Sequence, residues 1–324
     1  MSTSMPGTKE GLPGVAVAGG TALISGVSVF VNSYGVHAVK QPAVYTTAKN
    51  LVAVVILLTV VAIAGGLRRS GRWPLGERWT GAPPRSVGRS TGAWSPTRVA
   101  ALSYVGVVGG GIAFILFFDG LARTTATPAA FLRDSLVIWV AVLAVPFLGE
   151  RLHAWNIAAI ALLLGGQVVL LGGVGHLVAG SGQALILVAT LLWAVEVVIA
   201  KRLLVELSPA TVSLVRMGVG AVVLVAYLAV RGLLGALTSF TPVQWQWVLL
   251  TGLLLAGYVG TWMTALARAR AVDVTSVLVA STLVTTLLTG VTGPAPLTPD
   301  VLGLLLIAVG VATVAWSSRR PELA

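Results

Sequence analysis

The sequence predicts an all-α integral membrane protein whose ten transmembrane helices form two inverted five-helix repeats. Composition is the first observation: 56% of the 324 residues are hydrophobic and only 10% are charged, with a mean hydropathy of +0.95. Soluble proteins carry about a quarter charged residues, so a water-soluble domain is excluded. The other two observations are ten apolar stretches of membrane-spanning length and an alternation of basic and non-basic connections.

The same composition excludes several other classes of protein. Intrinsic disorder needs low hydrophobicity, which this chain does not have. The sequence has no cysteine, so it has no disulfide framework, zinc–thiolate site or cysteine nucleophile. Residues 1–13 are mostly polar and small, so we expect a cytoplasmic N-terminal tail and no cleaved signal peptide.

A helix that crosses the roughly 30 Å hydrocarbon core needs about 20 mostly apolar residues. Ten stretches meet this requirement, and we predict spans at residues 14–34, 43–66, 98–121, 127–148, 155–174, 182–201, 209–230, 244–265, 273–293 and 300–317. The connection 67–97 is rich in Gly, Pro, Ser and Arg, which predicts a disordered loop. We therefore divide the chain into residues 1–13 (tail), 14–174 (first repeat), 175–181 (linker), 182–318 (second repeat) and 319–324 (cytoplasmic C-terminal tail).

The basic residues predict the orientation. Of the 21 Lys and Arg residues, 15 fall in the two tails and the connections on the same side as the tails, and 3 fall in the opposite connections. Cytoplasmic loops carry an excess of Lys and Arg, so both termini are predicted to be cytoplasmic, in a multi-pass protein of the cytoplasmic membrane. This distribution also accounts for the net charge of +11. Because the basic loop has no recognisable nucleic-acid-binding fold, we expect no nucleic-acid partner.

Short matches in the same order relate the two halves of the chain. Lys49 in AKNLVAVVILL corresponds to Arg216 in VRMGVGAVVLV, and Arg123 in GLART corresponds to Arg268 in ALARA. Five spans in each half make the second half inverted relative to the first, and inverted repeats are typical of secondary transporters.

On these residues, together with VPFLGERL closing the fourth span and LLWAVEVVIAKRLL in the sixth, the chain resembles the drug/metabolite transporter superfamily. Within it, the chain is most similar to the EamA-type transporters, which are built from two five-helix repeats. The resemblance covers nearly all of the chain. It implies a basket-like helical bundle that carries small metabolites, often outward.

Ionisable side chains within a membrane are unfavourable and usually functional. Apart from the end residues of the spans, six lie within the predicted spans, three positive and three negative: Lys49, Asp119, Arg133, Asp134, Glu196 and Arg216. Their depths predict an outer group of four and an inner group, Glu196 with Arg216. They either flank a central cavity and exchange partners as the carrier alternates, or form permanent salt bridges. For Asp119 we favour a permanent pair with Arg123 at the membrane rim; Lys201 is expected to anchor a cytoplasmic helix end.

Polar and aromatic residues complete the candidate site. Ser28 and Asn32 are four residues apart and share a helix face, where they line a cavity or bond to a neighbouring helix. Trp193 and Trp262 lie deep in their spans, where they form either a wall for an apolar substrate or ordinary packing. The predicted substrate-binding residues are Ser28, Asn32, Lys49, Arg133, Asp134, Trp193, Glu196, Arg216 and Trp262.

These features predict a secondary transporter that exports a small organic metabolite by alternating access. An amino acid or a similar amphoteric solute would use Lys49 and Arg216 for its carboxylate, with Glu196 as ammonium partner or proton site; a drug-like compound is also considered. The alternative is a flippase for lipid or lipid-linked headgroups. The sequence has neither a Walker-type GxxxxGK[ST] motif nor an HExxH motif. We therefore expect no enzyme activity, cofactor or metal; the partners are a small-molecule substrate, protons as a candidate coupling ion and the lipid bilayer.

Overall fold

The computed structural model describes residues 11–69, 95–124, 126–173, 180–292 and 301–318. Within these ranges every regular element is a helix. Eight helices are long and apolar enough to cross a membrane, and two apolar helices of 17 residues accompany them. The prediction of ten spans in an all-α membrane protein is therefore confirmed over the described part of the chain.

The first repeat contains five spans, of which the third and fourth are interrupted. They are α1 (Gly11–Val39), α2 (Pro42–Arg69), the third span α4 (Pro96–Ser103), η1 (Tyr104–Ile112) and α5 (Ala113–Leu121), the fourth span α6 (Ala126–Asp134) and α7 (Leu136–Leu148), and α8 (Ala154–Leu170). The segment η1 is a π-helix, a form that is rare and often found at functional sites.

The second repeat has the same order of spans. They are α9 (Ser181–Leu203), α10 (Pro209–Val230), α11 (Pro242–Arg268), the fourth span α12 (Ala271–Leu278) and α13 (Ser281–Thr292), and α14 (Val301–Ser317), with a short 3₁₀ turn, η3 (Leu234–Thr238), before α11. The fourth span of each repeat is thus broken near its middle, at Ser135 and at residues 279–280. Broken helices at matching places in two repeats are typical of transporter binding sites.

The helix starts follow from local chemistry. Pro209 and Pro242 occupy the first turn of α10 and α11, where a missing N–H has little effect. The Ser208 hydroxyl accepts the N–H of Thr211, and Thr241 forms a reciprocal capping box with Gln244. These caps end each connection at a defined residue.

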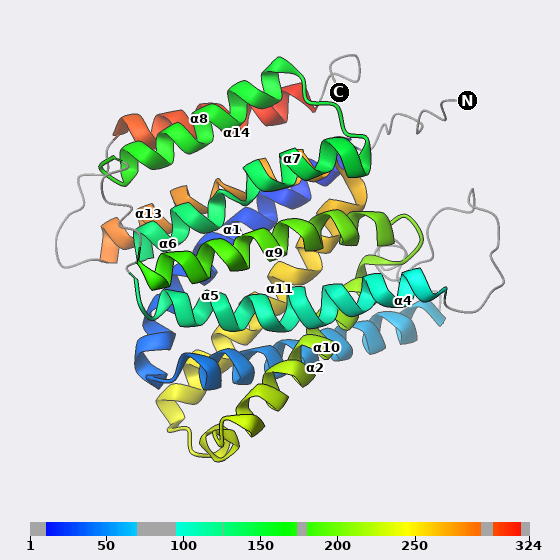
Figure 1. The fold of residues 1–324 in the computed structure, drawn as a ribbon, viewed down its shortest axis with the longest axis vertical. Coiled ribbons are helices and arrows are strands. Elements are labelled where there is room, and N and C mark those ends of the chain that lie inside the picture. Colours follow the sequence, from blue (N-terminus) through cyan, green and yellow to red (C-terminus); the bar gives the residue numbers. More distant parts are fainter. Residues whose placement is uncertain (1–10, 70–94, 125, 174–179, 293–300, 319–324) are drawn as a thin grey trace.

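The two repeats run in opposite directions. Figure 1 shows α1 beginning and α14 ending on the same side of the bundle; we call this side the terminal end. The chain crosses the bundle five times between the start of α1 and the start of α9, so α9 begins at the opposite end from α1. The second repeat is therefore inverted, as predicted. In Figure 1, α8 and α14 lie side by side along one edge of the molecule.

Glycines allow two close helix crossings. A Cβ atom on Gly166 of α8 would lie 2.6 Å from the carbonyl oxygen of Gly303 in α14. A Cβ atom on Gly110 of η1 would lie 2.0 Å from the carbonyl oxygen of Arg216 in α10. Side chains at these positions would force the helices apart, so small residues set the distance between them.

Some predicted boundaries change. The first helix begins at Gly11, inside the predicted tail 1–13, and α2 continues to Arg69, inside the predicted loop 67–97. The helix α4 begins at Pro96, also inside that predicted loop. Residues 70–94 of the loop lie outside the described residues, as do residues 1–10, most of the linker and the tail 319–324.

Candidate functional site

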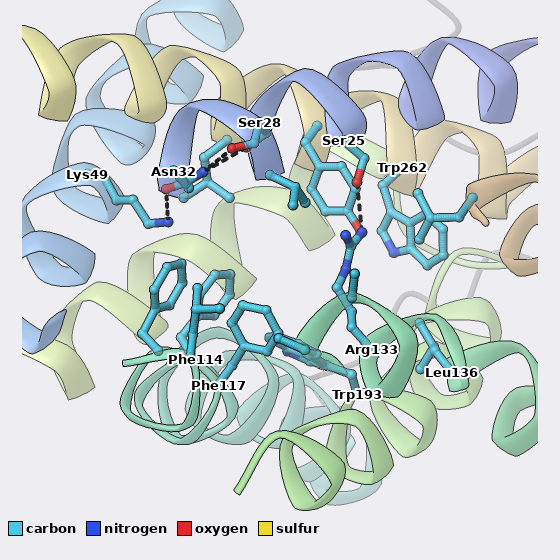
Figure 2. Close-up of a pocket in the computed structure, with 18 of the residues that line it drawn as sticks. Ser25, Ser28, Asn32, Lys49, Phe114, Phe117, Arg133, Leu136, Trp193 and Trp262 are labelled. Atoms are coloured by element: carbon cyan, nitrogen blue, oxygen red, sulfur yellow. Dashed lines mark hydrogen bonds between the residues drawn. The ribbon is translucent and has the colours of Figure 1, made fainter. Parts of the chain in front are cut away.

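A central cavity lies between the two repeats. Its volume, measured as the space open to the centres of water-sized molecules, is about 140 Å³, similar to engineered cavities that hold a benzene ring. In Figure 2, Ser25, Ser28 and Asn32 of α1 lie on one side, and Phe114, Phe117 and Trp193 lie on the other. The cavity brings together eight of the nine predicted binding residues: Ser28, Asn32, Lys49, Arg133, Trp193, Glu196, Arg216 and Trp262.

The Lys49 ammonium group is held by a neutral amide. Its Nζ donates to Asn32 Oδ1 at 2.9 Å, and the hydroxyl of Tyr45 donates to the same oxygen at 2.9 Å. The Asn32 amide nitrogen in turn donates to the carbonyl oxygen of Ser28 at 2.7 Å and to its hydroxyl oxygen at 3.0 Å. The polar face of α1 formed by Ser28 and Asn32 therefore lines the cavity and also forms a hydrogen bond to α2.

Aromatic rings surround the same ammonium group. Lys49 Nζ lies 3.8 Å from the centre of the Phe118 ring and 5.2 Å from that of Tyr45. These distances fall within the range of cation–π attraction. Lys49 is only 2% exposed, so its positive charge is stabilised by an amide oxygen and two ring faces.

Arg216, the counterpart of Lys49 in the second repeat, is held by a carboxylate. Its Nε donates to Glu196 Oε1 at 2.5 Å and its Nη2 donates to Glu196 Oε2 at 3.1 Å. Both side chains are at most 6% exposed. The predicted inner group is therefore a bidentate, buried ion pair between α9 and α10.

The predicted outer group does not form. Arg133 donates to Ser25 Oγ at 2.7 Å and lines the cavity (Figure 2). Its neighbour Asp134 is the one predicted binding residue that does not line the cavity: the carboxylate accepts hydrogen bonds from Gln167 at 2.8 Å and Thr282 at 2.6 Å. Consecutive helix residues point about 100° apart, so the two charges face different neighbours.

Asp119 is also separate from the cavity. It accepts a hydrogen bond from Arg123 at 2.7 Å, and both side chains are about half exposed. The pair between Asp119 and Arg123 at the helix end is therefore present, and among the described residues Asp119 forms no ion pair with the other charges of the predicted spans.

Aromatic side chains line two parts of the cavity, one with Phe114, Phe117 and Trp193 and the other with Trp262 (Figure 2). Trp193 contacts Phe114 edge-to-face at 5.5 Å and Phe117 at 5.3 Å between ring centres. Trp262 stacks on Tyr258 with ring centres 6.0 Å apart, and both rings line the cavity. Both predicted tryptophans therefore lie at the cavity surface, where they contribute apolar area and contact other aromatic residues.

The π-helix contributes a backbone group that the sequence did not suggest. The Gly109 carbonyl oxygen accepts from Trp193 Nε1 at 3.0 Å and from Arg216 Nη2 at 3.4 Å. A Cβ atom at Gly109 would lie 2.3 Å from the Glu196 Cδ atom. Gly109 therefore leaves room for the Glu196–Arg216 pair and positions it.

Sequence reasoning also missed several lining residues, although their spacing carried a signal. Ser25 lies three residues before Ser28 on the same helix face. Phe114, Phe117 and Phe118 have the spacing of a single face of α5. A search for faces, rather than for isolated residues, would have found them.

Charged groups at the terminal end connect helices outside the cavity. The Lys201 ammonium donates to the carbonyl oxygens of Leu266 and Ala269 at the end of α11, as expected for a helix-end anchor. The Glu150 carboxylate accepts the N–H groups of Ala271 and Val272 at the start of α12. Burial raises the pKa of Glu150, and those two backbone hydrogen bonds oppose the shift. Among the described residues no group of three His, Asp or Glu side chains could hold a metal ion.

Comparison with known proteins identifies the family. The profile of the EamA-like transporter family matches residues 12–172 and again residues 180–316. A comparison with curated proteins found no match. Among solved structures, one crystal structure has the same fold with a TM-score of 0.66 and 19% sequence identity, covering 95% of this chain and 99% of that chain. The two profile matches span nearly the whole chain and confirm the resemblance on which the two-repeat interpretation rested.

Proposed function

Because the chain belongs to the EamA-like transporter family, and is a multi-pass membrane transporter of the drug/metabolite type, we propose that it exports a small organic solute across the cytoplasmic membrane by alternating access. The observation that carries this proposal is the central cavity between the inverted repeats, which combines buried charges, hydroxyl and amide groups and an aromatic wall. Inverted repeats around a site in the middle of the membrane are the arrangement that rigid-body rocking requires.

The terminal end of the bundle is proposed to face the cytoplasm. Basic residues support this orientation, since Lys201, Arg202 and Arg270 cluster there while Lys40, Arg123 and Arg231 are the basic residues of the predicted opposite connections. Outward transport then begins with the solute entering the cavity from the terminal end. The Lys201 and Glu150 contacts with α11 and α12 would have to open to admit it.

Glu196 is proposed as the site where protons couple to transport. It is a buried carboxylate that lines the cavity, and its only charged partner within 4 Å among the described residues is Arg216. A proton on Glu196 would release Arg216, and loss of the proton would restore the pair. Glu196→Gln should then transport at a rate that does not depend on the pH gradient.

The test is counterflow in proteoliposomes. The purified protein is first screened by thermal unfolding against amino acids, nucleosides, sugars, polyamines, organic acids and cationic drugs, since a ligand of the folded state raises the unfolding temperature. A stabilising compound is then labelled and loaded into vesicles. Exchange that requires the protein supports the carrier. Movement of labelled lipid headgroups without solute exchange would instead establish a flippase and overturn the proposal.

A further inference from the structure

The wall of the central cavity carries more positive than negative charge. Three basic side chains line it, Lys49, Arg133 and Arg216, and one carboxylate does, Glu196. Within the described residues, Arg216 is the one cation of the three that has a carboxylate oxygen within 4 Å. Lys49 and Arg133 therefore form an excess of positive charge at the cavity surface, with no carboxylate oxygen within 4 Å of either. In a medium of low polarity such an excess attracts an anion and repels a cation.

Lys49 has the geometry of an anchor for an anion. An ammonium group has three N–H donors, and one of them is used by Asn32 Oδ1. The ring faces of Phe118 and Tyr45 offer electron density but no full negative charge. The remaining N–H groups can therefore donate to a carboxylate oxygen, and the bond would join two charged groups within a buried site.

Glu196 has no carboxylate oxygen that is free of Arg216 and could bind a ligand's ammonium group. Both of its oxygens already accept hydrogen bonds from the Arg216 guanidinium. The other carboxylate near the cavity, Asp134, faces Gln167 and Thr282 instead. An amino acid or an amine would thus bring a positive charge into a cavity with no free carboxylate among the described residues.

The rest of the wall favours a flat apolar body. Phe114, Phe117, Trp193, Tyr258 and Trp262 line the cavity, and its volume of about 140 Å³ is of the size that accommodates one aromatic ring. Arg133, half-buried and bonded to Ser25, adds a second cation on the opposite part of the wall from Lys49 (Figure 2).

From these contacts we infer that the cavity binds an organic monoanion with an aromatic body, its carboxylate on Lys49 and its ring against the aromatic wall. This inference rests on the proposed carrier function and narrows its substrate from an amphoteric solute to an anion. The charges that decide it are Lys49 and Arg133, because Arg216 is already neutralised by Glu196.

Four compounds that share a phenyl ring and differ in charge test this inference. They are 3-phenylpropionate (anion), 3-phenylpropan-1-ol (neutral), phenylalanine (zwitterion) and phenethylamine (cation). Their binding to the full-length protein in detergent is measured by thermal unfolding and by calorimetry. We expect 3-phenylpropionate to bind most tightly and to raise the unfolding temperature most. This comparison uses the parent protein alone, so it does not depend on the folding of any variant.

Two variants then locate the anion. Lys49→Met should weaken binding of 3-phenylpropionate by at least about tenfold, the range expected for loss of a charge-assisted hydrogen bond. Lys40→Met, which removes the same charge from an exposed residue outside the cavity, should leave binding unchanged. Lys49→Arg, which keeps the positive charge, should retain most of the affinity for 3-phenylpropionate.

The outcomes separate this inference from the carrier proposal. Equal binding of the alcohol, tighter binding of phenylalanine or phenethylamine, no binding of 3-phenylpropionate, or binding that survives Lys49→Met would each overturn the anion site. None of these results affects the carrier function, which is decided by solute exchange in vesicles. Conversely, 3-phenylpropionate that binds through Lys49 while no stabilising solute exchanges would support the site and overturn the carrier.

Discussion

The two repeats place a basic residue at matching positions but give it different partners. In the second repeat, Arg216 on α10 meets a carboxylate, Glu196 on α9. In the first repeat, Lys49 on α2 meets a neutral amide, Asn32 on α1. In each repeat the cation also lies against a ring of α5, Phe114 for Arg216 and Phe118 for Lys49. The two sites thus share their framework and differ by one negative charge.

This difference separates structural charge from binding charge. A buried ion pair with both oxygens engaged is complete by itself, and removing either partner leaves an uncompensated charge. A cation held by an amide and ring faces keeps part of its charge available to a ligand. The second repeat therefore contributes an ion pair that holds α9 to α10 as long as Glu196 is charged, and the first contributes a cation that can bind a ligand.

The largest expected difference is in the free energy of unfolding, between a variant that lacks Arg216 and one that lacks Lys49. Arg216→Met leaves Glu196 buried without its partner and should lower the free energy of unfolding by about 3–5 kcal/mol. Lys49→Met removes a buried cation that has no carboxylate and should stay within about 1 kcal/mol of the parent. Denaturant unfolding in mixed micelles measures both. Equal losses in the two variants would contradict the distinction between the repeats.

Gly109 gives the next largest effect. A methyl group there would collide with the Glu196 carboxyl group, 2.3 Å away, so Gly109→Ala should destabilise the protein by about 1–3 kcal/mol, as overpacking does. Gly218→Ala in α10 is the matched control, because a Cβ atom at Gly218 meets no atom within 4 Å. If both substitutions behave alike, Gly109 does not position the ion pair.

Trp193→Phe should destabilise the protein less than Arg216→Met or Gly109→Ala. It removes the indole N–H that donates to the Gly109 carbonyl oxygen, a net loss of about 0.5–1.5 kcal/mol. The value should lie at the lower end because Arg216 still donates to that oxygen. Unfolding under the same conditions measures this loss. A loss as large as that of Arg216→Met would show that Trp193 stabilises this part of the second repeat as much as the Glu196–Arg216 ion pair does.

Periodicity and charge were enough to predict most of the fold. Apolar length predicted the ten spans, and the alignment of Lys49 with Arg216 helped to predict that the two halves of the chain are repeats. Helix ends were less certain, since α1 and α2 extend beyond the apolar stretches into polar residues such as Gly11 and Arg69. Such extensions depend on hydrogen bonds at the helix ends and not on hydropathy.

The candidate site was predicted less completely, for a geometric reason. Sequence spacing gives the depth of a charge in its span but not the direction in which it points. Arg133 and Asp134 have nearly the same depth, yet Arg133 reaches Ser25 in the cavity and Asp134 reaches Thr282 outside it. The role of Gly109 could not be predicted, because it depends on a backbone carbonyl that accepts hydrogen bonds from two side chains of other helices.

The central claim is that the missing carboxylate of the first repeat leaves room for an anionic ligand, and Asn32→Asp tests it most directly. The substitution gives Lys49 the partner that Arg216 already has, and the Ser28 hydroxyl can donate to the new oxygen. Gln41→Glu, at an exposed residue outside the cavity, adds the same charge as a control. The measurement is the affinity of each folded variant for 3-phenylpropionate. We predict that Asn32→Asp loses binding while Gln41→Glu keeps it; unchanged affinity in Asn32→Asp would contradict the account.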